Sequence, residues 1–263
     1  MENYHDMAPP SAIFFDIDGT LCRYEETVTL KTRECFAQLH KGGHKLFLCT
    51  GRSPADISKD IYSLGFDGVI SCMGAIVCVG NHELRHRFIP RDMLLKTVKA
   101  LIDQKIPALI LGKNEVLRTE YMVPSQLETG VVRRLDDLYR NEVLAHISSL
   151  DMEYKSVDSL GNLKTLIEEH SDLVEYSPQN GQTRLHGVNK ASGISLVLSL
   201  PEFNGMRSYA IGDSQNDLEM LKSVDVSIAM GDSPEEVKCA ADWCTLTVEE
   251  EGVFHAMKHF YLI

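Results

Sequence analysis

The apolar positions of the N-terminal third alternate between strand-like runs and helical spacing. The runs "SAIFFD" (11–16) and "HKLFLCT" (44–50) are short and rich in strand-forming residues. Between them, residues 29–43 carry apolar side chains at helical spacing, and Gly42 and Gly43 stop the pattern. This order predicts a strand, a helix and a second strand that is parallel to the first.

The next segment carries clear signals for a helix start and a helix stop. Ser53 can cap a helix, Pro54 suits its first turn, and Gly65 ends the pattern. We therefore expect a helix over 54–65, followed by a pair of strands at 68–73 and 75–80 around Gly74.

The C-terminal third repeats the alternation of strands and helices. The pattern predicts, in chain order, a helix over 190–200, a strand over 208–213, a helix over 216–224, a strand over 226–232 and a helix that opens at Ser233 and Pro234. Together with the N-terminal units, this predicts an α/β fold: a doubly wound, Rossmann-like parallel sheet with helices on both faces.

The middle of the chain has a different character, with more charge and more turns. Helical spacing covers 90–104 and 160–170, and the strand candidates are 115–123, 152–159 and 172–179. We expect an inserted α+β domain over 84–185, and a discontinuous core domain made of 1–83 and 186–263.

Composition restricts the partners and the location of the protein. The 263 residues carry a formal charge of −12, which argues against a nucleic-acid or anionic-membrane surface. No apolar run reaches the roughly 20 residues of a membrane span, and the N-terminal residues lack the plan of a signal peptide. We expect a cytoplasmic protein that neither binds nucleic acid nor spans a membrane.

Seven scattered cysteines agree with a cytoplasmic location. Cys49, Cys72 and Cys78 lie in apolar runs and are expected to be buried thiols rather than parts of a disulfide framework. Cys239 and Cys244 are the nearest approach to a metal-binding pair, but no second pair of thiols or nearby histidine completes a zinc site.

Two aspartates follow the first predicted strand, in "IFFDIDGTL". Ligands of open parallel sheets bind beyond the carboxyl ends of the strands, and Asp16 stands at such an end. Asp16 and Asp18 could bind a divalent cation or divide the roles of nucleophile and acid/base, and Gly19 permits the sharp turn behind them. The simpler alternative is an Asp-rich turn that closes a strand. A calcium-binding EF-hand is excluded, because Leu21 stands where that loop needs glycine.

Polar groups also follow the second predicted strand and open the helix after the insertion. Thr50, with the amides of Gly51 and Arg52, can hold phosphate oxygens. Lys190 offers a compact positive charge, although an isolated lysine is more often a solvated surface group.

A second acidic group, in "AIGDSQNDLEML", follows the strand at 208–213. Asp213, Asn216 and Asp217 stand at the mouth of a helix, where acidic residues often serve only as caps. Alone, these three residues do not distinguish a functional site from a helix cap. Their combination with the groups around Asp16, Thr50 and Lys190 favours a functional site.

The order DxDGT, then TGR, then Lys, then GDxxND resembles the haloacid dehalogenase superfamily of phosphatases. The insertion between Thr50 and Lys190, together with "GDSQNDLEML" and "IAMGDSPEEVKCAAD", is similar to the Cof-like hydrolases, which carry a large α/β cap at this point. The motifs cover the core segments 11–83 and 186–263, whereas the likeness of the cap rests on its position and length.

This resemblance implies a division of labour among the residues. Asp16 would attack phosphorus and form an aspartyl-phosphate, and Asp18 would protonate the leaving oxygen and then activate water. Thr50 and Lys190 would bind the charged phosphoryl oxygens. Arg52 would lie towards the cap, where it could touch the substrate.

The resemblance also implies Mg²⁺, held by the Asp16 carboxylate, the Asp18 backbone carbonyl and Asp213. Asn216 and Asp217 would support the metal and Lys190, either as direct ligands or from behind them. The expected substrate is a small phosphorylated metabolite, such as a sugar phosphate or a nucleotide-like cofactor, and the protein is expected to be a monomer or a homodimer.

Two residues depart from the pattern of these hydrolases. Met73 stands in "CMGA" where the family often has asparagine, and Asp232 stands in "AMGDS" where "AMGNA" is common. Neither removes a catalytic element. Two other functions stay open at this point: a sugar phosphomutase, and a binding protein that keeps the fold without catalysis.

Overall fold

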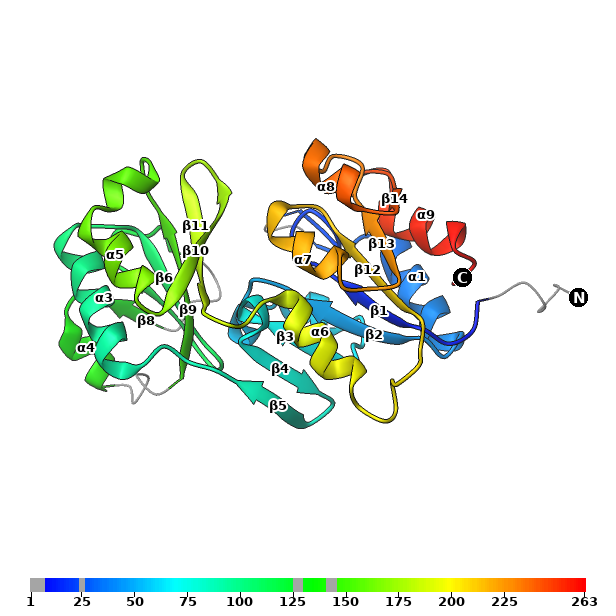
Figure 1. The fold of residues 1–263 in the computed structure, drawn as a ribbon, viewed down its shortest axis with the longest axis horizontal. Coiled ribbons are helices and arrows are strands. Elements are labelled where there is room, and N and C mark those ends of the chain that lie inside the picture. Colours follow the sequence, from blue (N-terminus) through cyan, green and yellow to red (C-terminus); the bar gives the residue numbers. More distant parts are fainter. Residues whose placement is uncertain (1–7, 24–26, 125–129, 141–145) are drawn as a thin grey trace, which may run out of the picture.

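The computed structural model describes residues 8–23, 27–124, 130–140 and 146–263. Figure 1 shows these residues as two lobes, each built around its own β-sheet. The N-terminal and C-terminal parts of the chain make one lobe, which we call the core. The middle of the chain makes the other, which we call the cap.

The core sheet has eight strands in the order β14-β13-β12-β1-β2-β3-β4-β5. Their bounds, in chain order, are β1 (Ala12–Phe15), β2 (Lys45–Cys49), β3 (Gly68–Ser71), β4 (Ile76–Val79), β5 (His82–His86), β12 (Ser208–Gly212), β13 (Val226–Ala229) and β14 (Trp243–Cys244). Neighbours from β14 to β3 run parallel, and β4 and β5 add an antiparallel edge.

The central strand β1 is buried on both faces, because helices cover each side of the sheet. Ile13 and Phe15 pack towards α1 (Leu30–Lys41) and α9 (Gly252–His259). Ala12 and Phe14 pack against the other helical layer. That layer consists of α6 (Lys190–Leu198), α7 (Leu218–Leu221) and α8 (Glu235–Ala240). The expected doubly wound α/β core is therefore confirmed.

The cap sheet has six strands in the order β10-β11-β9-β6-β7-β8. Their bounds are β6 (Ala108–Gly112), β7 (Val116–Thr119), β8 (Gly130–Val132), β9 (Ile147–Glu153), β10 (Ser171–Ser177) and β11 (Asn180–Leu185). The helices α3 (Arg91–Asp103), α4 (Leu135–Arg140) and α5 (Asn162–Glu168) cover the outer face of this sheet (Figure 1). The hairpin β10–β11 forms the edge of the cap towards the core.

The single helix expected over 54–65 is replaced by two shorter elements. A 3-10 turn, η1 (Pro54–Asp56), is separated from α2 (Lys59–Tyr62) by Ile57, whose backbone is extended. Ser58, rather than Ser53, caps the α-helix by accepting a bond from the Ile61 amide. The prediction of one helix was wrong because the cap signal at Ser58 interrupts the helical spacing.

The cap strands were predicted only in part. The candidates at 115–123 and 172–179 are confirmed in position by the shorter β7 and β10. The candidate at 152–159 was wrong, since β9 ends at Glu153 and the 3-10 turn η4 (Val157–Leu160) follows. Strands β6, β8 and β11 were not predicted from the sequence. Strand β5 continues to His86 and pairs with β4, so we propose that the core segment ends there rather than at residue 83.

No helix within the described ranges combines the length and the apolar character of a membrane span.

Candidate active site

The strand order aligns three sequence motifs at one edge of the core sheet. Strand β1 lies between β12 and β2 and runs parallel to both. The residues that follow these strands are Asp213 after β12, Asp16 after β1 and Thr50 after β2. Because parallel strands end at the same edge, motifs that are far apart in the sequence meet in one place.

Gly19 allows the loop after β1 to fold closely against Asp213. Its φ angle is +82°, in the left-handed region that disfavours other residues. A Cβ atom at this position would lie 2.4 Å from Oδ2 of Asp213. The glycine of the DxDGT motif is therefore needed both for the turn and for the approach of the Asp213 carboxylate.

Lys190 is a fully buried cation that joins two of the motifs. Its side chain is 1% exposed, and its Nζ donates to Oδ1 of Asp16 at 2.7 Å and to Oδ1 of Asp217 at 2.6 Å. It also donates to Oδ1 of Asn216 at 3.0 Å. Lys190 is therefore not the solvated surface group that an isolated lysine often is. Its hydrogen bonds to Asp16, Asp217 and Asn216 compensate for the burial, which would be strongly unfavourable for an unpaired ammonium.

The start of α6 is fixed in place by local contacts. Asn189 caps the helix by accepting from the Ser192 amide at 2.7 Å. Gly74 lies so close that a Cβ atom on it would be 2.1 Å from the carbonyl oxygen of Asn189. The turn after β3 thus holds the first residue of α6, Lys190, at the sheet edge.

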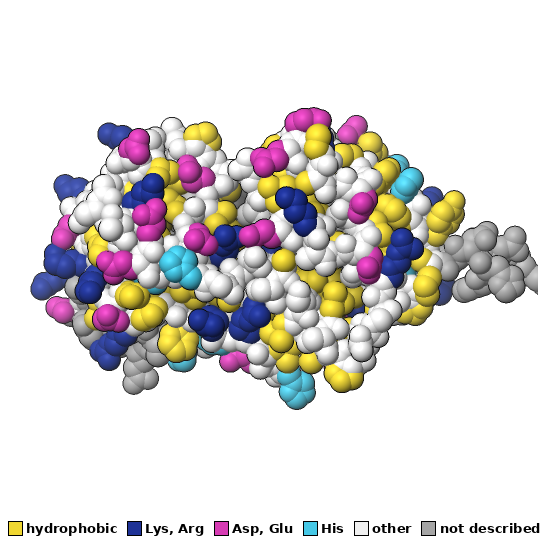
Figure 2. All heavy atoms as spheres, in the orientation of Figure 1, with side chains coloured by type: hydrophobic (Ala, Val, Ile, Leu, Met, Phe, Trp, Pro, Cys, Tyr) yellow, Lys and Arg dark blue, Asp and Glu magenta, His cyan; other side chains and the backbone are white. Residues whose placement is uncertain are grey.

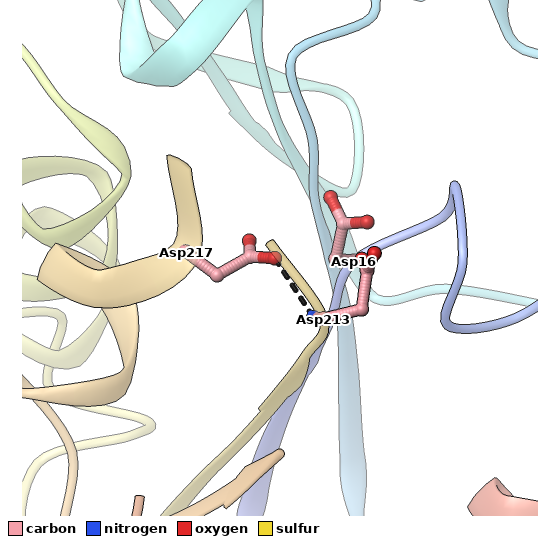
Figure 3. A group of neighbouring side chains, drawn as sticks. All are labelled: Asp16, Asp213 and Asp217. Atoms are coloured by element: carbon pink, nitrogen blue, oxygen red, sulfur yellow. Dashed lines mark hydrogen bonds between the residues drawn. The ribbon is translucent and has the colours of Figure 1, made fainter. Parts of the chain in front are cut away.

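Asp217 uses both of its carboxylate oxygens within the protein. Oδ1 accepts from Lys190, and Oδ2 accepts from the backbone amides of Asp213 and Ser214 at 3.0 and 3.1 Å. Figure 3 shows the second of these oxygens against the Asp213 nitrogen, with the Asp16 and Asp213 side chains next to each other. Asp217 therefore orients Asp213 and Lys190.

The site is strongly acidic and largely shielded from solvent. Burial raises the pKa of Asp16 well above its ordinary value; Lys190 opposes this effect, whereas Asp217, Asp213 and Asp18 add to it. Burial, together with Asp217, raises the pKa of Asp213 to about 7. Burial alone would lower the pKa of Lys190, but Asp16 and Asp217 outweigh it and the pKa is raised.

The residues present fit a small divalent cation. One carboxylate oxygen from each of Asp16, Asp213 and Asp217 lies within 4.8 Å of the others. Lys190 supplies one positive charge to these three acids, so a further cation would relieve the remaining repulsion. Hard carboxylate oxygens are the ligands that Mg²⁺ prefers. Since both oxygens of Asp217 already accept hydrogen bonds, Asp16 and Asp213 are the better candidates for direct contact.

The carboxylate of Asp18 does not join this cluster, because Arg52 holds it. Arg52 donates from Nε to Oδ2 at 2.8 Å and from Nη2 to Oδ1 at 2.5 Å, which is a two-pronged ion pair. A third nitrogen of Arg52 donates to the carbonyl of Asp56 at 3.2 Å. The arginine of the TGR motif therefore links Asp18 to η1.

The phosphate-binding loop predicted after β2 is partly buried and contacts the cap. The Oγ1 atom of Thr50 accepts from the Arg52 amide at 3.1 Å, and Thr50 is 1% exposed. Gln182 of the cap strand β11 donates to the carbonyl oxygen of Gly51 at 2.6 Å. Gln182 could not be singled out from the sequence, because nothing in its neighbourhood distinguishes it from other polar residues on a strand.

Met73 and Asp232, the two departures from the family pattern, each contact identifiable neighbours. Met73 is buried with a left-handed backbone (φ 54°), and its methyl group would be 3.3 Å from a Cβ atom on Gly51. Asp232 forms an ion pair with Arg23, which also pairs with Glu249 at 2.7 Å. The acid at position 232 is thus partly neutralised by Arg23, although it still contributes to the raised pKa of Asp213.

All seven cysteines are described and all are free thiols. Cys49 and Cys72 are buried as expected, whereas Cys78 is only partly covered. Cys239 and Cys244 are exposed, because they lie at the surface edge of the core on α8 and β14.

Comparison with known proteins agrees with this geometry. A family model described as haloacid dehalogenase-like hydrolase matches residues 13–257. YkrA of Bacillus subtilis (strain 168) is 29% identical over 259 residues, which cover 95% of this chain and 98% of YkrA. From the same organism, the 5-amino-6-(5-phospho-D-ribitylamino)uracil phosphatase YcsE is 25% identical over 257 residues, covering 95% of each chain.

The solved structure of the subclass IIB sugar phosphatase BT4131 superimposes with a TM-score of 0.79 at 24% identity. The match covers 96% of this chain and 100% of that one, and at this level of identity it shows a shared fold. With the family model matching nearly the whole chain, the protein belongs to the haloacid dehalogenase-like hydrolases.

Proposed function

We propose that this protein is a Mg²⁺-dependent phosphatase that hydrolyses phosphate monoesters of small metabolites through an aspartyl-phosphate on Asp16. The observation that carries the proposal is the buried Lys190, which bonds Asp16 and Asp217 directly beside Asp213. A buried cation among three carboxylates at the ends of parallel strands suits a reaction that moves negative charge.

In the first step, an oxygen of Asp16 attacks phosphorus, and the bond from phosphorus to the leaving oxygen breaks. Lys190 bonds Oδ1 of Asp16, which leaves Oδ2 as the attacking atom. Asp18 donates a proton to the leaving oxygen, which departs as an alcohol. Thr50 and Lys190 bind the phosphoryl oxygens while charge spreads over them. For this, Lys190 gives up one of the three bonds that its ammonium makes in the structure.

In the second step, Asp18 takes a proton from water, and the water oxygen attacks the phosphorus of the aspartyl-phosphate. The bond between phosphorus and the Asp16 oxygen breaks, so phosphate leaves and the carboxylate is restored. Both uses of Asp18, as acid and as base, require its carboxylate to separate from Arg52, to which it is bound in the structure. The first use also requires the released carboxylate to take up a proton before the leaving oxygen departs. Substrate that draws Arg52 away would make that separation easier.

Mg²⁺ would be held by Asp16, by the backbone carbonyl of Asp18 and by Asp213, and it would offset the repulsion between a carboxylate and a phosphate dianion. Asp217 and Asn216 would act from behind these ligands, since both bind Lys190. The raised pKa values of Asp16 and Asp213 support this assignment, because a bound cation would favour their ionised forms.

The cap would select the alcohol part of the substrate. Its sheet faces the core next to η1, and the side chain of Gln182 reaches the loop that carries Thr50. One relative acts, by name, on a phosphorylated ribitylaminouracil, which supports a small phosphorylated metabolite as the substrate class. We expect the reaction to take place in the cytoplasm.

The test is phosphate release from a panel of phosphorylated metabolites, measured with Mg²⁺ and with EDTA. Asp16→Asn removes the attacking charge with little change in shape. Asp103→Asn, at an exposed position at the end of α3 in the cap, is the matched control for the same chemical change. We expect Mg²⁺-dependent release by the wild-type protein and by Asp103→Asn, and a loss of at least about 10³-fold in Asp16→Asn.

Release that survives in Asp16→Asn would refute the role of Asp16. Absence of release from every compound in the wild-type protein would refute the phosphatase assignment. Product analysis separates hydrolysis from a phosphomutase, which would return an isomeric phosphate ester instead of free phosphate.

A further inference from the structure

We propose that Gln182 of the cap is a positioning residue that orients the phosphate-binding loop through the peptide group between Gly51 and Arg52. This inference rests on the proposed function, because it assigns Thr50 to the phosphoryl group. Gln182 and Gly51 are 131 positions apart in the sequence and belong to different lobes.

The contact is short and specific, and Gln182 itself is buried. Gln182 is 4% exposed, and its Nε2 donates to the Gly51 carbonyl oxygen at 2.6 Å. The orientation of the side-chain amide is defined, because a carbonyl oxygen can only accept and therefore requires the NH₂ group. The other amide atom, Oε1, lies 2.5 Å from the position that a Cβ atom on Gly51 would occupy. Any residue larger than glycine at 51 would thus force the side-chain amide of Gln182 to shift.

The same peptide group leads directly to Thr50. Its carbonyl, from Gly51, is held by Gln182, and its N–H, from Arg52, donates to Oγ1 of Thr50 at 3.1 Å. Because a peptide group is planar and rigid, fixing the carbonyl also fixes the direction of the N–H. Since Thr50 Oγ1 accepts this bond, its own O–H hydrogen must point elsewhere. Gln182 therefore restricts the direction in which Thr50 can donate to a phosphoryl oxygen.

A second contact keeps the hairpin β10–β11 against the core. Arg184, two residues after Gln182 on the same strand, donates to Oε2 of Glu219 on α7 at 2.5 Å. Its other terminal nitrogen pairs with Asp172 at 3.0 Å. Figure 2 shows acidic and basic side chains side by side where the two lobes meet. The ion pair of Arg184 is weakened by water, because the side chains of Arg184 and Glu219 are 22% and 41% exposed.

As a consequence, the phosphate-binding loop takes its catalytic geometry only when the cap is closed against the core. In the open state the Gly51 carbonyl would lose its partner, and the Thr50 hydroxyl would be oriented less strictly. Interactions with the phosphoryl oxygens act mainly in the transition state, so the loss of Gln182 should lower kcat more than it raises KM.

Three variants test this role. Gln182→Glu keeps the shape but sets a carboxylate oxygen against the Gly51 carbonyl, and Gln182→Leu removes the bond altogether. Gln179→Glu makes the same chemical change at an exposed position of the same hairpin, and serves as the control. Steady-state kinetics with Mg²⁺ and the best substrate of the panel are measured from pH 5 to pH 8. Far-UV circular dichroism melting verifies that each variant is folded.

At pH 8 we expect kcat of Gln182→Glu and Gln182→Leu to fall by about tenfold or more, with KM changed by less than about threefold. Loss of one oriented donor costs roughly 10²–10³ in rate, and Gln182 affects such a donor only through Thr50. The carboxyl group introduced by Gln182→Glu can donate to Gly51 when it is neutral, so the ratio of variant to wild-type kcat should recover towards pH 5. The same ratio should stay low for Gln182→Leu. The charged groups near this position are Asp151, which pairs with Gln182 across the strands, Asp56 and Arg52. The two acids favour the neutral carboxyl, and Arg52 opposes it.

If the wild-type enzyme releases phosphate and the Gln182 variants have the same kcat at every pH, the positioning role is wrong and the phosphatase assignment stays intact. Equal losses in both Gln182 variants without recovery at low pH would also overturn the positioning role, since that result indicates a purely structural effect. A wild-type protein without phosphatase activity would remove the proposed function itself.

Discussion

Replacing Lys190 by methionine is the sharpest probe of how the site is stabilised. Methionine keeps most of the length and volume of the lysine side chain but removes its charge. In the structure the ammonium bonds Asp16 and Asp217, whose side chains are 7% and 0% exposed. The variant would leave two buried carboxylates without their cation.

Removing one partner of a buried ion pair costs about 3–5 kcal/mol, because the remaining charge is no longer compensated. The cost should depend on pH. The pKa of Asp16 is already raised by burial in spite of Lys190, so loss of the lysine raises it further. A carboxyl whose pKa in the folded protein exceeds its unfolded value of about 3.9 destabilises the fold above that pH, and increasingly so until the folded pKa is passed. The stability lost in the variant should therefore be largest at pH 8 and shrink towards pH 4.

Urea denaturation at pH 5, 6.5 and 8, followed by fluorescence, measures this loss. The single tryptophan, Trp243, lies on the core strand β14 and reports on the core. Lys222→Met, at an exposed position after α7, is the matched control and should change stability by less than about 0.5 kcal/mol. A Lys190→Met variant as stable as wild type at pH 8, or a loss of equal size at every pH, would refute the electrostatic account.

Three further outcomes are expected. Gly19→Ala and Gly205→Ala both force alanine to a positive φ (82° and 81°), but only at Gly19 would a Cβ atom meet Asp213. Calorimetric titration should thus show Mg²⁺ binding weakened by more than about tenfold (~1.4 kcal/mol) in Gly19→Ala alone, and equal weakening in both would contradict this reading. Burial raises the pKa of Asp151 to about 7, so its ionisation above that pH destabilises the fold. Asp151→Asn should therefore be more stable than wild type at pH 8, and this gain in stability should be smaller at pH 5. Urea midpoints of both proteins at the two pH values measure the gain. A thiol reagent should modify Cys239 and Cys244 rapidly in the native protein, whereas fast reaction of Cys49 or Cys72, which are buried, would contradict the packing.

Much of the site could be predicted because its residues mark the ends of core strands. Asp16, Thr50 and Asp213 each follow a short apolar run, and parallel strands bring such ends together whatever their distance in the sequence. The buried contact of Lys190 could be anticipated only from its combination with these motifs. A lone lysine at a helix start carries no local signal of burial.

The contacts between the lobes could not be predicted, because they depend on the topology of the cap. Gln182 lies on β11, a strand that the sequence pattern did not reveal, since the polar side chains of Gln182 and Arg184 face the core rather than solvent. The ion pair between Asp18 and Arg52 is likewise a tertiary contact between two loops, which the sequence pattern cannot predict. Ser53 was expected to cap a helix, yet its hydroxyl is buried with no hydrogen-bond partner within the described structure.

The most direct test of the central claim is mass spectrometry of the protein quenched in acid during turnover. The experiment uses Asp18→Asn, in which Asp16 can still attack phosphorus but the base for hydrolysis is missing. The substrate, given with Mg²⁺, is an activated aryl phosphate whose leaving group needs no proton. The account predicts one added phosphoryl group on the peptide that contains Asp16, absent when Asp16→Asn is also introduced. A phosphoryl group on another residue, or unmodified protein from an enzyme that turns over in its wild-type form, would contradict it.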